Sequence, residues 1–361
     1  MAKLRVAVIM GGASAERAVS LASGRKVVAN LDQARYQVHS LDLHALPGAR
    51  RLALRAFDPL QSEAAREAEN GLPEADKTGQ NRTQMSPVVP ESVANGHVDL
   101  AFLALHGGAG EDGTTQGLLE LLGVPYTGSG VLASALAMNK ILSKKLFLAE
   151  GIPTPPFVYA QGAAEVEAKA AEAASELGFP LVVKPACQGS TVGISIVRSA
   201  AALPAALELA LSHGPEVLLE QFIAGTEITA GLLGNRDPEV LPLVEIVPSS
   251  GFYDYEAKYT PGATEEIVPA RIPHHQAEIS AKLARATYRA LGCQGVGRVD
   301  MIATQDEVYV LEMNTLPGLT ETSLVPRAAQ AAGISFPALL DRIIELALQA
   351  HPPRGQAQES Q

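Results

Sequence analysis

Cysteine and aromatic side chains are scarce in this sequence. Its 361 residues include only two cysteines, Cys187 and Cys293, no tryptophan, and 4% aromatic residues in total. Two cysteines this far apart supply neither a disulfide framework nor the paired spacing of a zinc site. Basic residues are also in deficit, because 28 lysines and arginines stand against 39 acids and give a net charge of −11. This balance argues against a nucleic-acid-binding surface.

Long apolar runs are missing as well. No stretch reaches the ~18 apolar residues of a membrane span, and the start, MAKLR followed by VAVIM, lacks a signal-peptide cleavage pattern. We therefore expect a cytoplasmic protein that binds neither membrane nor nucleic acid. With 47% hydrophobic residues, the chain can bury a large core and should divide into two or three domains.

The most informative stretch is residues 295–324, GVGRVDMIATQDEVYVLEMNTLPGLTETSL. Two strand-like runs, 296–303 and 308–313, flank a polar break and predict a hairpin. Because side chains alternate along strands, Asp300 should face Glu312, and Arg298 should face Asn314. Facing carboxylates repel each other unless a cation lies between them. This oxygen-only set suits Mg²⁺, although a solvated outer face explains the pairing equally well.

The amino-terminal segment has the pattern of an α/β unit. A strand over 4–10 is followed by two glycines and by Ser14, a candidate N-cap for a helix ending near Asn30. The dinucleotide motif G-x-G-x-x-G is not completed, because Ala13 and Glu16 stand where it needs glycine. Glu16 could instead hold an ammonium group, or it could simply complement the helix dipole.

Two further strands are predicted, over 36–42 and 98–105, with a surface loop at 61–86 between them to which we assign no chemistry. The second strand runs into His106 and the loop GGAGEDG. Open α/β sheets bind ligands at the carboxyl ends of their strands. His106 is therefore either a ligand contact or an ordinary residue at a strand end.

The middle of the chain predicts a nucleotide site in several pieces. A helix over 131–150 carries Lys140, Lys144 and Lys145, and an alanine-rich helix covers 163–177. The strand 179–184 leads into the glycine-rich loop KPACQGSTVG and a return strand over 194–197. This order differs from the Walker motif, yet such a hairpin could fold over phosphates or be an ordinary turn. A strand over 217–220, a short linker with a free backbone edge and a second acid, Glu227, could bind an adenine edge and a ribose diol.

The order of these motifs resembles the ATP-grasp superfamily. GGASAERAVSL, HGGAGEDGTTQG, GSGVLASALAMNK, KPACQGSTVG, FYDYEAKY and LEMNTLPGLTETSL look like the successive motifs of D-alanine–D-alanine ligases, and the likeness spans about Val6 to Ala347. It implies an α/β fold, with a Rossmann-like parallel-sheet domain followed by a two-lobed ATP-grasp fold. The implied units are 1–128, 129–217 and 218–351, with a polar tail at 352–361, and the implied assembly is a homodimer.

The resemblance also implies a role for each residue that matches a family motif. The catalytic residues would be Glu16, Ser190, Tyr259, Arg298 and Gly318. The substrate-binding residues would be His106, Lys258, Ser323 and Leu324. ATP would be held by Lys140, Lys184, Gly189, Ser190, Thr191, Glu220, Gln221, Phe222, Ile223 and Glu227. Two Mg²⁺ ions, with Mn²⁺ as a substitute, would be held by Asp300, Glu312 and Asn314.

The implied reaction joins two D-alanine molecules through a D-alanyl phosphate, under a closing loop at 251–270. Tyr259 after Lys258 implies a dipeptide product, because ester-forming relatives have phenylalanine there. Two alternatives stay open: an ATP-grasp ligase for other substrates, such as D-lactate, and an ATP-binding module without turnover. Departures from the family pattern are Ala18, Thr191 and the filling Ala186-Cys187-Gln188 of the phosphate loop.

Overall fold

A computed structural model of the chain describes residues 2–43, 98–249, 260, 262–320 and 323–352. The predicted surface loop at 61–86 lies outside these residues. Lys258 and Tyr259 also lie outside them, as does half of the predicted closing loop at 251–270. The end of that segment forms a strand, β11 (Thr264–Ile267), so it is not a loop throughout.

The amino-terminal part is a three-stranded parallel sheet with the strand order β2-β1-β3. Its strands are β1 (Leu4–Met10), β2 (Tyr36–Asp42) and β3 (Leu100–Leu103), so β3 is shorter than predicted. The run VAVIM is buried throughout β1, as expected for the central strand of a parallel sheet. Helix α1 (Arg17–Asn30) begins later than predicted, and Glu16 occupies its N-cap position. Ser14 lies two residues before that position: its hydroxyl accepts from the Glu16 N–H at 3.2 Å and donates to the His106 carbonyl at 2.5 Å.

Three helices follow, α5 (Thr114–Leu122), α6 (Val131–Met138) and α7 (Lys140–Ala149). The prediction of a single helix over 131–150 was wrong because the chain is extended at Asn139. The Asn139 side chain caps α7 by accepting from the Leu142 N–H at 3.0 Å. The Lys140 N–H donates to the Ala186 carbonyl at 3.0 Å. The break therefore joins the start of α7 to the glycine-rich loop.

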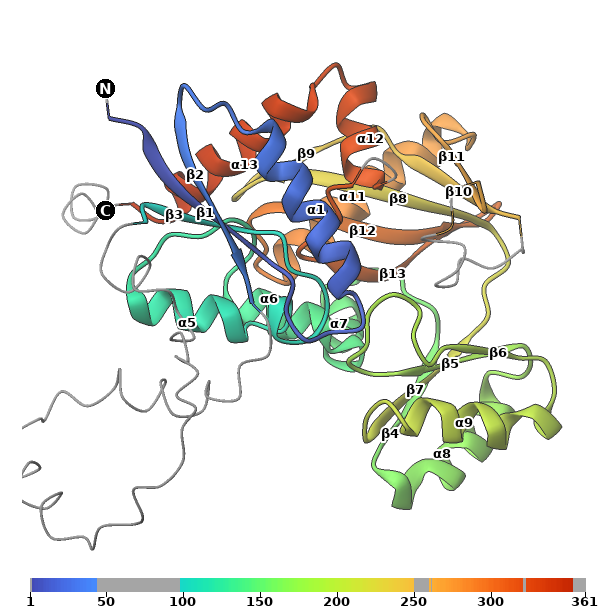
Figure 1. The fold of residues 1–361 in the computed structure, drawn as a ribbon. Helices are drawn as coiled ribbons and strands as arrows, with labels where there is room; N and C mark the ends of the chain where they lie inside the picture. The colour runs from blue at the N-terminus through green and yellow to red at the C-terminus, as the bar shows by residue number, and fades with distance from the viewer. Residues whose placement is uncertain (1, 44–97, 250–259, 261, 321–322, 353–361) are drawn as a thin grey trace, which may run out of the picture.

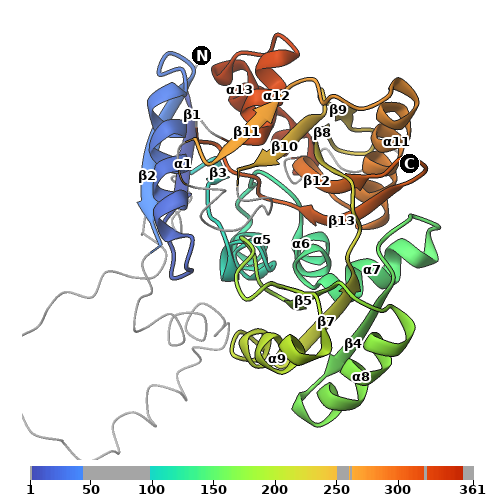
Figure 2. The ribbon, with the colours of Figure 1, turned by 90° about the vertical axis from the view of Figure 1, so that its right-hand side faces the viewer.

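A four-stranded antiparallel sheet forms a separate lobe, with the order β4-β7-β5-β6. The strands are β4 (Phe157–Gln161), β5 (Leu181–Pro185), β6 (Ser195–Val197) and β7 (Glu216–Gln221), and helices α8 (Ala163–Glu176) and α9 (Leu203–Leu211) pack on them. Figures 1 and 2 show this lobe standing away from the amino-terminal sheet. Its core includes Ala173, Val183 and Leu219, all fully buried. The glycine-rich loop joins β5 to β6, which confirms the predicted hairpin.

The largest sheet has the order β11-β10-β8-β12-β13, with the short β9 (Glu239–Val240) beside β8. Its other strands are β8 (Thr226–Gly234), β10 (Val244–Pro248), β12 (Gly295–Ala303) and β13 (Val308–Asn314), and α11 (His274–Ala290) packs against it. The register of the β12–β13 hairpin confirms the sequence prediction, because Asp300 pairs with Glu312 and Arg298 with Asn314.

The chain ends in α12 (Leu324–Ala331) and α13 (Phe336–Ala350). Helix α13 returns to the amino-terminal sheet, so the first and last elements share one hydrophobic core.

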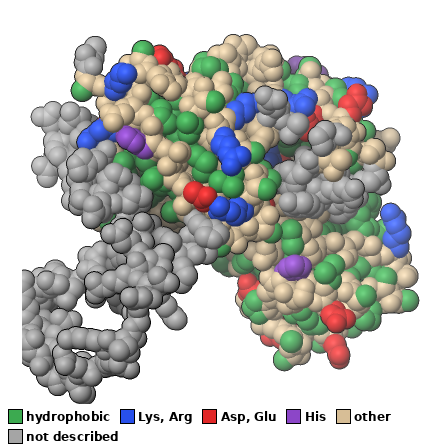
Figure 3. All heavy atoms as spheres, viewed as in Figure 1, with side chains coloured by type: hydrophobic (Ala, Val, Ile, Leu, Met, Phe, Trp, Pro, Cys, Tyr) green, Lys and Arg blue, Asp and Glu red, His purple; other side chains and the backbone are tan. Residues whose placement is uncertain are grey.

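In the part of the chain that the structure describes, no helix is both long and apolar enough to cross a membrane. On the face in Figure 3, the described acidic and basic side chains are interspersed and form no continuous basic stripe.

Candidate active site

Two pockets meet beside the β12–β13 hairpin, and Glu312 lines both of them. The first, which we name the substrate pocket, is lined by eleven of the predicted site residues: Glu16, His106, Lys140, Gly189, Ser190, Arg298, Glu312, Asn314, Gly318, Ser323 and Leu324. The nucleotide pocket contains the others that the structure describes: Lys184, Thr191, Glu220, Gln221, Phe222, Ile223, Glu227 and Asp300. Residues from all three sheets and their loops are thus brought together.

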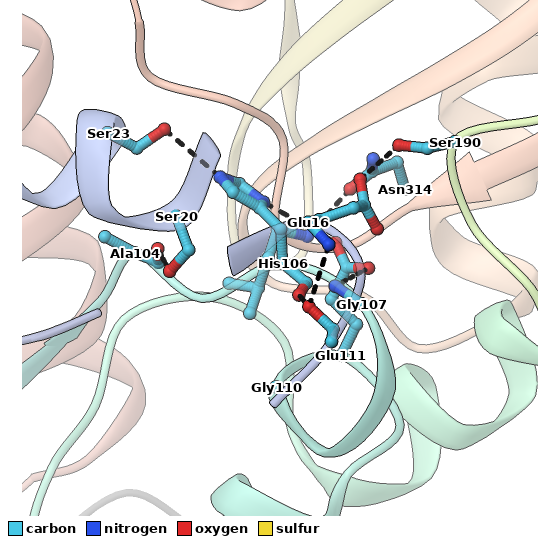
Figure 4. Close-up of polar contacts among 12 residues, drawn as sticks. Glu16, Ser20, Ser23, Ala104, His106, Gly107, Gly110, Glu111, Ser190 and Asn314 are labelled. Carbon is cyan, nitrogen blue, oxygen red and sulfur yellow. Dashed lines mark hydrogen bonds and ion pairs between the residues drawn. The ribbon is translucent and has the colours of Figure 1, made fainter. Parts of the chain in front are cut away.

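The glycine-rich loop reaches across to the amino-terminal domain at Ser190. The Ser190 hydroxyl donates to the Glu16 carboxylate, and Figure 4 shows this contact beside Asn314. Ser190 and Thr191 have φ angles of 50° and 61°, a left-handed conformation that is uncommon for residues other than glycine. Such backbone strain concentrates in loops that bind ligands. The Lys140 ammonium donates to the Gln188 carbonyl at 2.7 Å and so holds the other side of this loop.

His106 is buried between two polar side chains. Its Nε2 lies 3.2 Å from the Ser23 hydroxyl on α1, and its Nδ1 lies 3.9 Å from the Glu111 carboxylate. Glu111 also accepts from the Gly107 N–H at 2.8 Å, which ties the GGAGEDG loop together. The sequence prediction assigned Glu111 no role, although an acid in a loop after a strand was a usable signal.

The hairpin supplies the charged centre of the site. Arg298 forms a two-point ion pair with Asp300, at 2.8 Å from Nε and 2.7 Å from Nη2. Asp300 also accepts from the Thr229 hydroxyl at 2.6 Å. On the neighbouring strand, the Glu312 carboxylate lies 3.1 Å from the Lys140 ammonium. The two facing carboxylates are thus each paired with a cation, as their repulsion requires.

The donor set on this face fits a magnesium site. Asp300, Glu312 and Asn314 offer only oxygen ligands on paired positions of neighbouring strands. Among the described residues, no group of three or more histidine, cysteine, aspartate or glutamate side chains gathers to form a closed metal cage. Mg²⁺ is usually held by one or two carboxylates together with substrate phosphates, so two acids and an amide at the edge of a nucleotide pocket match its needs.

The wall of the nucleotide pocket contains a buried charge cluster. The Glu220 carboxylate forms ion pairs with Lys184 and with Lys144, the latter at 2.7 Å. Burial by itself raises the pKa of Glu220, but the two ammonium groups outweigh it and hold that pKa below its usual value. Burial lowers the pKa of Lys144 to about 8, against the opposing effect of Glu220. The carboxylate of Glu220 is therefore occupied within the protein.

Part of the backbone of the linker around the end of β7 is also hydrogen-bonded within the protein. The sequence suggested a free backbone edge there, yet the Gln221 N–H donates to Pro156 and the Phe222 N–H donates to Pro180. Those two amides are bonded within the protein, which corrects the prediction of a fully free edge. Glu227 lies at the start of β8, on the same pocket.

The loop between β13 and α12 closes the other side of the substrate pocket. Ser323 stands at the N-cap position of α12, and its hydroxyl accepts from the Thr320 N–H at 2.9 Å. The backbone of Gly318 lies close to the Ser323 side chain, since a Cβ at position 318 would lie 2.7 Å from the Ser323 hydroxyl. The N-terminus of a helix favours anions, so the predicted carboxylate site has suitable surroundings.

Comparison with known proteins agrees with this architecture. The models for the D-ala D-ala ligase N-terminus and C-terminus match residues 5–129 and 146–345. The D-alanine–D-alanine ligase of Desulforamulus reducens is 46% identical over 96% of this chain and 99% of its own length. That of Pelotomaculum thermopropionicum is 44% identical, with 96% and 97% covered.

Two solved structures extend the comparison. The Bacillus anthracis D-alanine–D-alanine ligase complexed with ATP superposes with a TM-score of 0.75 at 36% identity, covering 98% of this chain and 100% of that one. The VanG D-Ala:D-Ser ligase of Enterococcus faecalis has the same TM-score at 34% identity, covering 96% and 100%.

The parallel amino-terminal sheet and the two antiparallel sheets around a nucleotide pocket define an ATP-grasp enzyme. Within that class, the chain belongs to the D-alanine–D-alanine ligase family.

Proposed function

We propose that this ATP-dependent D-alanine–D-alanine ligase carries out both steps of its reaction where the substrate pocket meets the nucleotide pocket. The enzyme serves peptidoglycan synthesis. The carboxylate of one D-alanine takes the γ-phosphate of ATP and ADP leaves. The amine of a second D-alanine then attacks the acyl carbon, loses a proton and displaces inorganic phosphate to form the peptide bond. The position of Glu312 between the two pockets is the observation that supports this proposal.

The first D-alanine is proposed to bind beside α1. Glu16 would pair with its ammonium group, and the hydroxyl of Ser190 orients that carboxylate by donating to it. His106, with Glu111 behind it, lies in the same pocket and would contact the same substrate. Tyr259 completes this group in the proposal that rests on the family motif.

ATP is proposed to lie in the nucleotide pocket, with its phosphates directed toward Glu312. Lys140, Lys184 and the backbone of Gly189 to Thr191 would neutralise and cradle the phosphates, and Lys258 would reach the transferred phosphate. The stretch Glu220, Gln221, Phe222 and Ile223 would hold adenine, and Glu227 the ribose hydroxyls. Because the Glu220 side chain is paired with two lysines, Glu220 would contact adenine through its backbone.

Asp300, Glu312 and Asn314 would hold magnesium, for which we propose two ions. When bound, such ions offset phosphate charge and help to align the reacting oxygens. The protein's own contribution is to keep these oxygen donors on one face of a buried hairpin, where their spacing is set by the strand register.

The second step requires stabilisation of an oxyanion at the carbonyl carbon under attack. Arg298 and the Gly318 N–H, both at the substrate pocket, are proposed to donate to this oxygen. Ser323 and the backbone of Leu324 would receive the carboxylate of the second D-alanine at the N-terminus of α12.

The substrate class is tested by ATP-dependent phosphate release over D-alanine, D-serine, D-lactate and the L-amino acids. Release with D-alanine alone, with D-alanyl-D-alanine as the product, is the expected result. Release with an L-amino acid but not with D-alanine would overturn the proposal. A protein that binds ATP but releases no phosphate with any of these compounds would be a module without turnover.

Arg298→Ala should lower turnover by roughly 10²-fold or more, the scale of one oxyanion donor, while ATP affinity stays within a few-fold. Steady-state rates and calorimetric ATP binding provide the measurement. Arg289→Ala is a matched control, because Arg289 forms its ion pair with Asp237 on the surface. Near-normal turnover in Arg298→Ala would remove Arg298 from the catalytic group.

We further propose that the chain folds as units 1–128, 129–217 and 218–351 and acts in the cytoplasm as a homodimer. Leu121 on α5 and Leu132 on α6 are 70% and 71% exposed on neighbouring helices, an apolar surface suited to a second copy. Sedimentation equilibrium measures the mass directly, and a monomer at all concentrations would contradict the dimer.

A further inference from the structure

Lys144 is a fully buried lysine for which the proposed roles have no use. It stands on α7 four residues after Lys140 and has a relative exposure of 0%. Its ammonium lies 2.7 Å from Glu220 and 2.5 Å from the Thr154 hydroxyl. The Thr154 hydroxyl donates its proton to the Val310 carbonyl at 2.8 Å, so it accepts from Lys144. A buried ammonium is costly unless it is paired and hydrogen-bonded, and here both conditions hold.

The charges around Glu220 do not cancel. Glu220 is shared between Lys144 on one oxygen and Lys184 on the other, so two ammonium groups surround one carboxylate. Lys184 lines the nucleotide pocket, whereas Lys144 lies behind its wall. This cluster of three side chains, which we name the Glu220 cluster, therefore carries one net positive charge when all three groups are ionised.

The surroundings explain why that excess charge matters. The described residues that line the nucleotide pocket include five acids: Glu220, Glu227, Glu245, Asp300 and Glu312. Lys184 is the one lysine or arginine among them. A polyphosphate approaching such a wall is repelled unless cations compensate, and low polarity strengthens each interaction. If Lys184 alone neutralised Glu220, little of its charge would act on a phosphate.

We propose that Lys144 is a positioning residue for the nucleotide, which pairs with Glu220 from behind the pocket and so leaves the Lys184 ammonium available to phosphate. The inference rests on the proposed function, because it assigns a further residue to the same nucleotide pocket. Lys144 touches no substrate in this arrangement and acts through Glu220 alone.

The first test compares Lys144→Met with the wild type in ATP binding, measured by calorimetry with magnesium and without D-alanine. The Kd for ATP should rise about ten-fold, because Glu220 would then be neutralised by Lys184 alone, while the KM for D-alanine stays within about two-fold. Lys145→Met is the matched control, since Lys145 is exposed on the same helix and lies over the Tyr159 ring at 4.2 Å. Its ATP affinity should not change.

A double-mutant cycle separates this role from a structural one. In a Glu220→Gln background there is no carboxylate for Lys144 to hold, so adding Lys144→Met should change the Kd for ATP by less than about two-fold. An equal loss of affinity in both backgrounds would show that Lys144 acts otherwise and overturn the proposal. Thermal unfolding will show whether Lys144→Met alone folds. If it does not, the Kd for ATP is compared between Glu220→Gln and the double variant Glu220→Gln/Lys144→Met.

The two proposals fail in distinguishable ways. If the wild type binds no ATP, the proposed function fails. If the wild type binds ATP and folded Lys144→Met binds it equally well, only the role of Lys144 fails.

Discussion

At the scale of single residues, two buried serines on α1 have the same chemistry but different neighbours. Ser20 and Ser23 are both fully buried. The Ser20 hydroxyl donates to the Ala104 carbonyl and accepts from the Gly11 N–H, each at 2.7 Å, within the amino-terminal domain. Ser23 accepts from the Leu319 N–H at 3.3 Å, which leaves its proton available for Nε2 of His106. Ser23 thus links His106 to the loop that contains Gly318.

Ser23→Ala should therefore lower turnover about ten-fold, because a small displacement of Gly318 and His106 misaligns reacting groups. Each of the two variants, Ser23→Ala and Ser20→Ala, is expected to lower the free energy of unfolding by ~1–3 kcal/mol, the scale of a lost buried hydrogen bond. In Ser20→Ala, however, turnover should be nearly unchanged. Steady-state kinetics and thermal unfolding of both variants provide the measurement. Equal turnover in the two would show that Ser23 is only a packing residue.

At the scale of elements, the β12–β13 hairpin holds the charged groups in register. Val299 and Met301 are fully buried on the face opposite Asp300. A shift of the strand pairing by one residue would place these apolar side chains in the pocket and the acid in the core. Burial of the apolar side chains therefore fixes the register, and with it the positions of the polar side chains on the other face. The alternation of apolar and polar residues on β12 is the reason that the pairing was predictable.

Strand β10 is tied to the chain after β11 by an ion pair whose strength depends on pH. The Glu245 carboxylate accepts from the Arg271 backbone N–H at 2.9 Å and from its guanidinium at 2.8 and 2.9 Å. The Arg271 hydrogen bonds outweigh burial and hold the pKa of Glu245 below its usual value of 4.5. A lowered folded-state pKa means that this pair stabilises the fold above pH 4.5, and that the contribution is lost as the pH falls through the folded value.

Glu245→Gln should accordingly lower the urea midpoint at neutral pH, and the gap to the wild type should narrow as the pH falls below 4.5. Urea titrations of both proteins across this range provide the test. Glu239→Gln is a useful control, because its partner Arg342 and Glu239 itself are both well exposed and such pairs contribute little. A gap that stays constant with pH would contradict the assignment.

At the scale of the whole molecule, the two ends of the described chain form one core. Val6 and Val8 of β1 belong to the same buried cluster as Leu340 and Ile344 of α13. The blue strands and red helices lie together in Figures 1 and 2. The four-stranded lobe has a core of its own. This division predicts that the lobe can move relative to a rigid body made from both ends of the chain.

Leu340→Ala should therefore destabilise the protein by about 2–5 kcal/mol, as for a leucine removed from a packed core. Hydrogen exchange should accelerate in β1 and β3 as well as in α13, and remain slow in β5 and β7. Leu207→Ala, in the core of the lobe, should show the reverse pattern. Uniform acceleration everywhere would indicate a single cooperative unit.

Local pattern and family motifs predicted most of the secondary structure and the residues of both pockets. Alternation fixed the pairing of Asp300 with Glu312, and apolar runs marked β1 and β5. Errors arose where a distant partner competes with a local preference. Ser14 has the residue type of an N-cap and accepts from the Glu16 N–H, yet it also donates to the His106 carbonyl, 92 residues away, and the helix begins only at Arg17. The helix break at Asn139 accompanies a bond from Lys140 to Ala186.

The sequence by itself determined which chemical groups this protein can offer and on which face of each strand they lie, because side-chain alternation and hydrophobic periodicity are local properties. Only the tertiary structure decided which charges share a partner. Lys144 and Lys184 come from different elements and meet at Glu220, and Lys140 of α7 pairs with Glu312 of β13. Such contacts depend on how separate sheets and helices pack, and long-range packing leaves no period in the sequence.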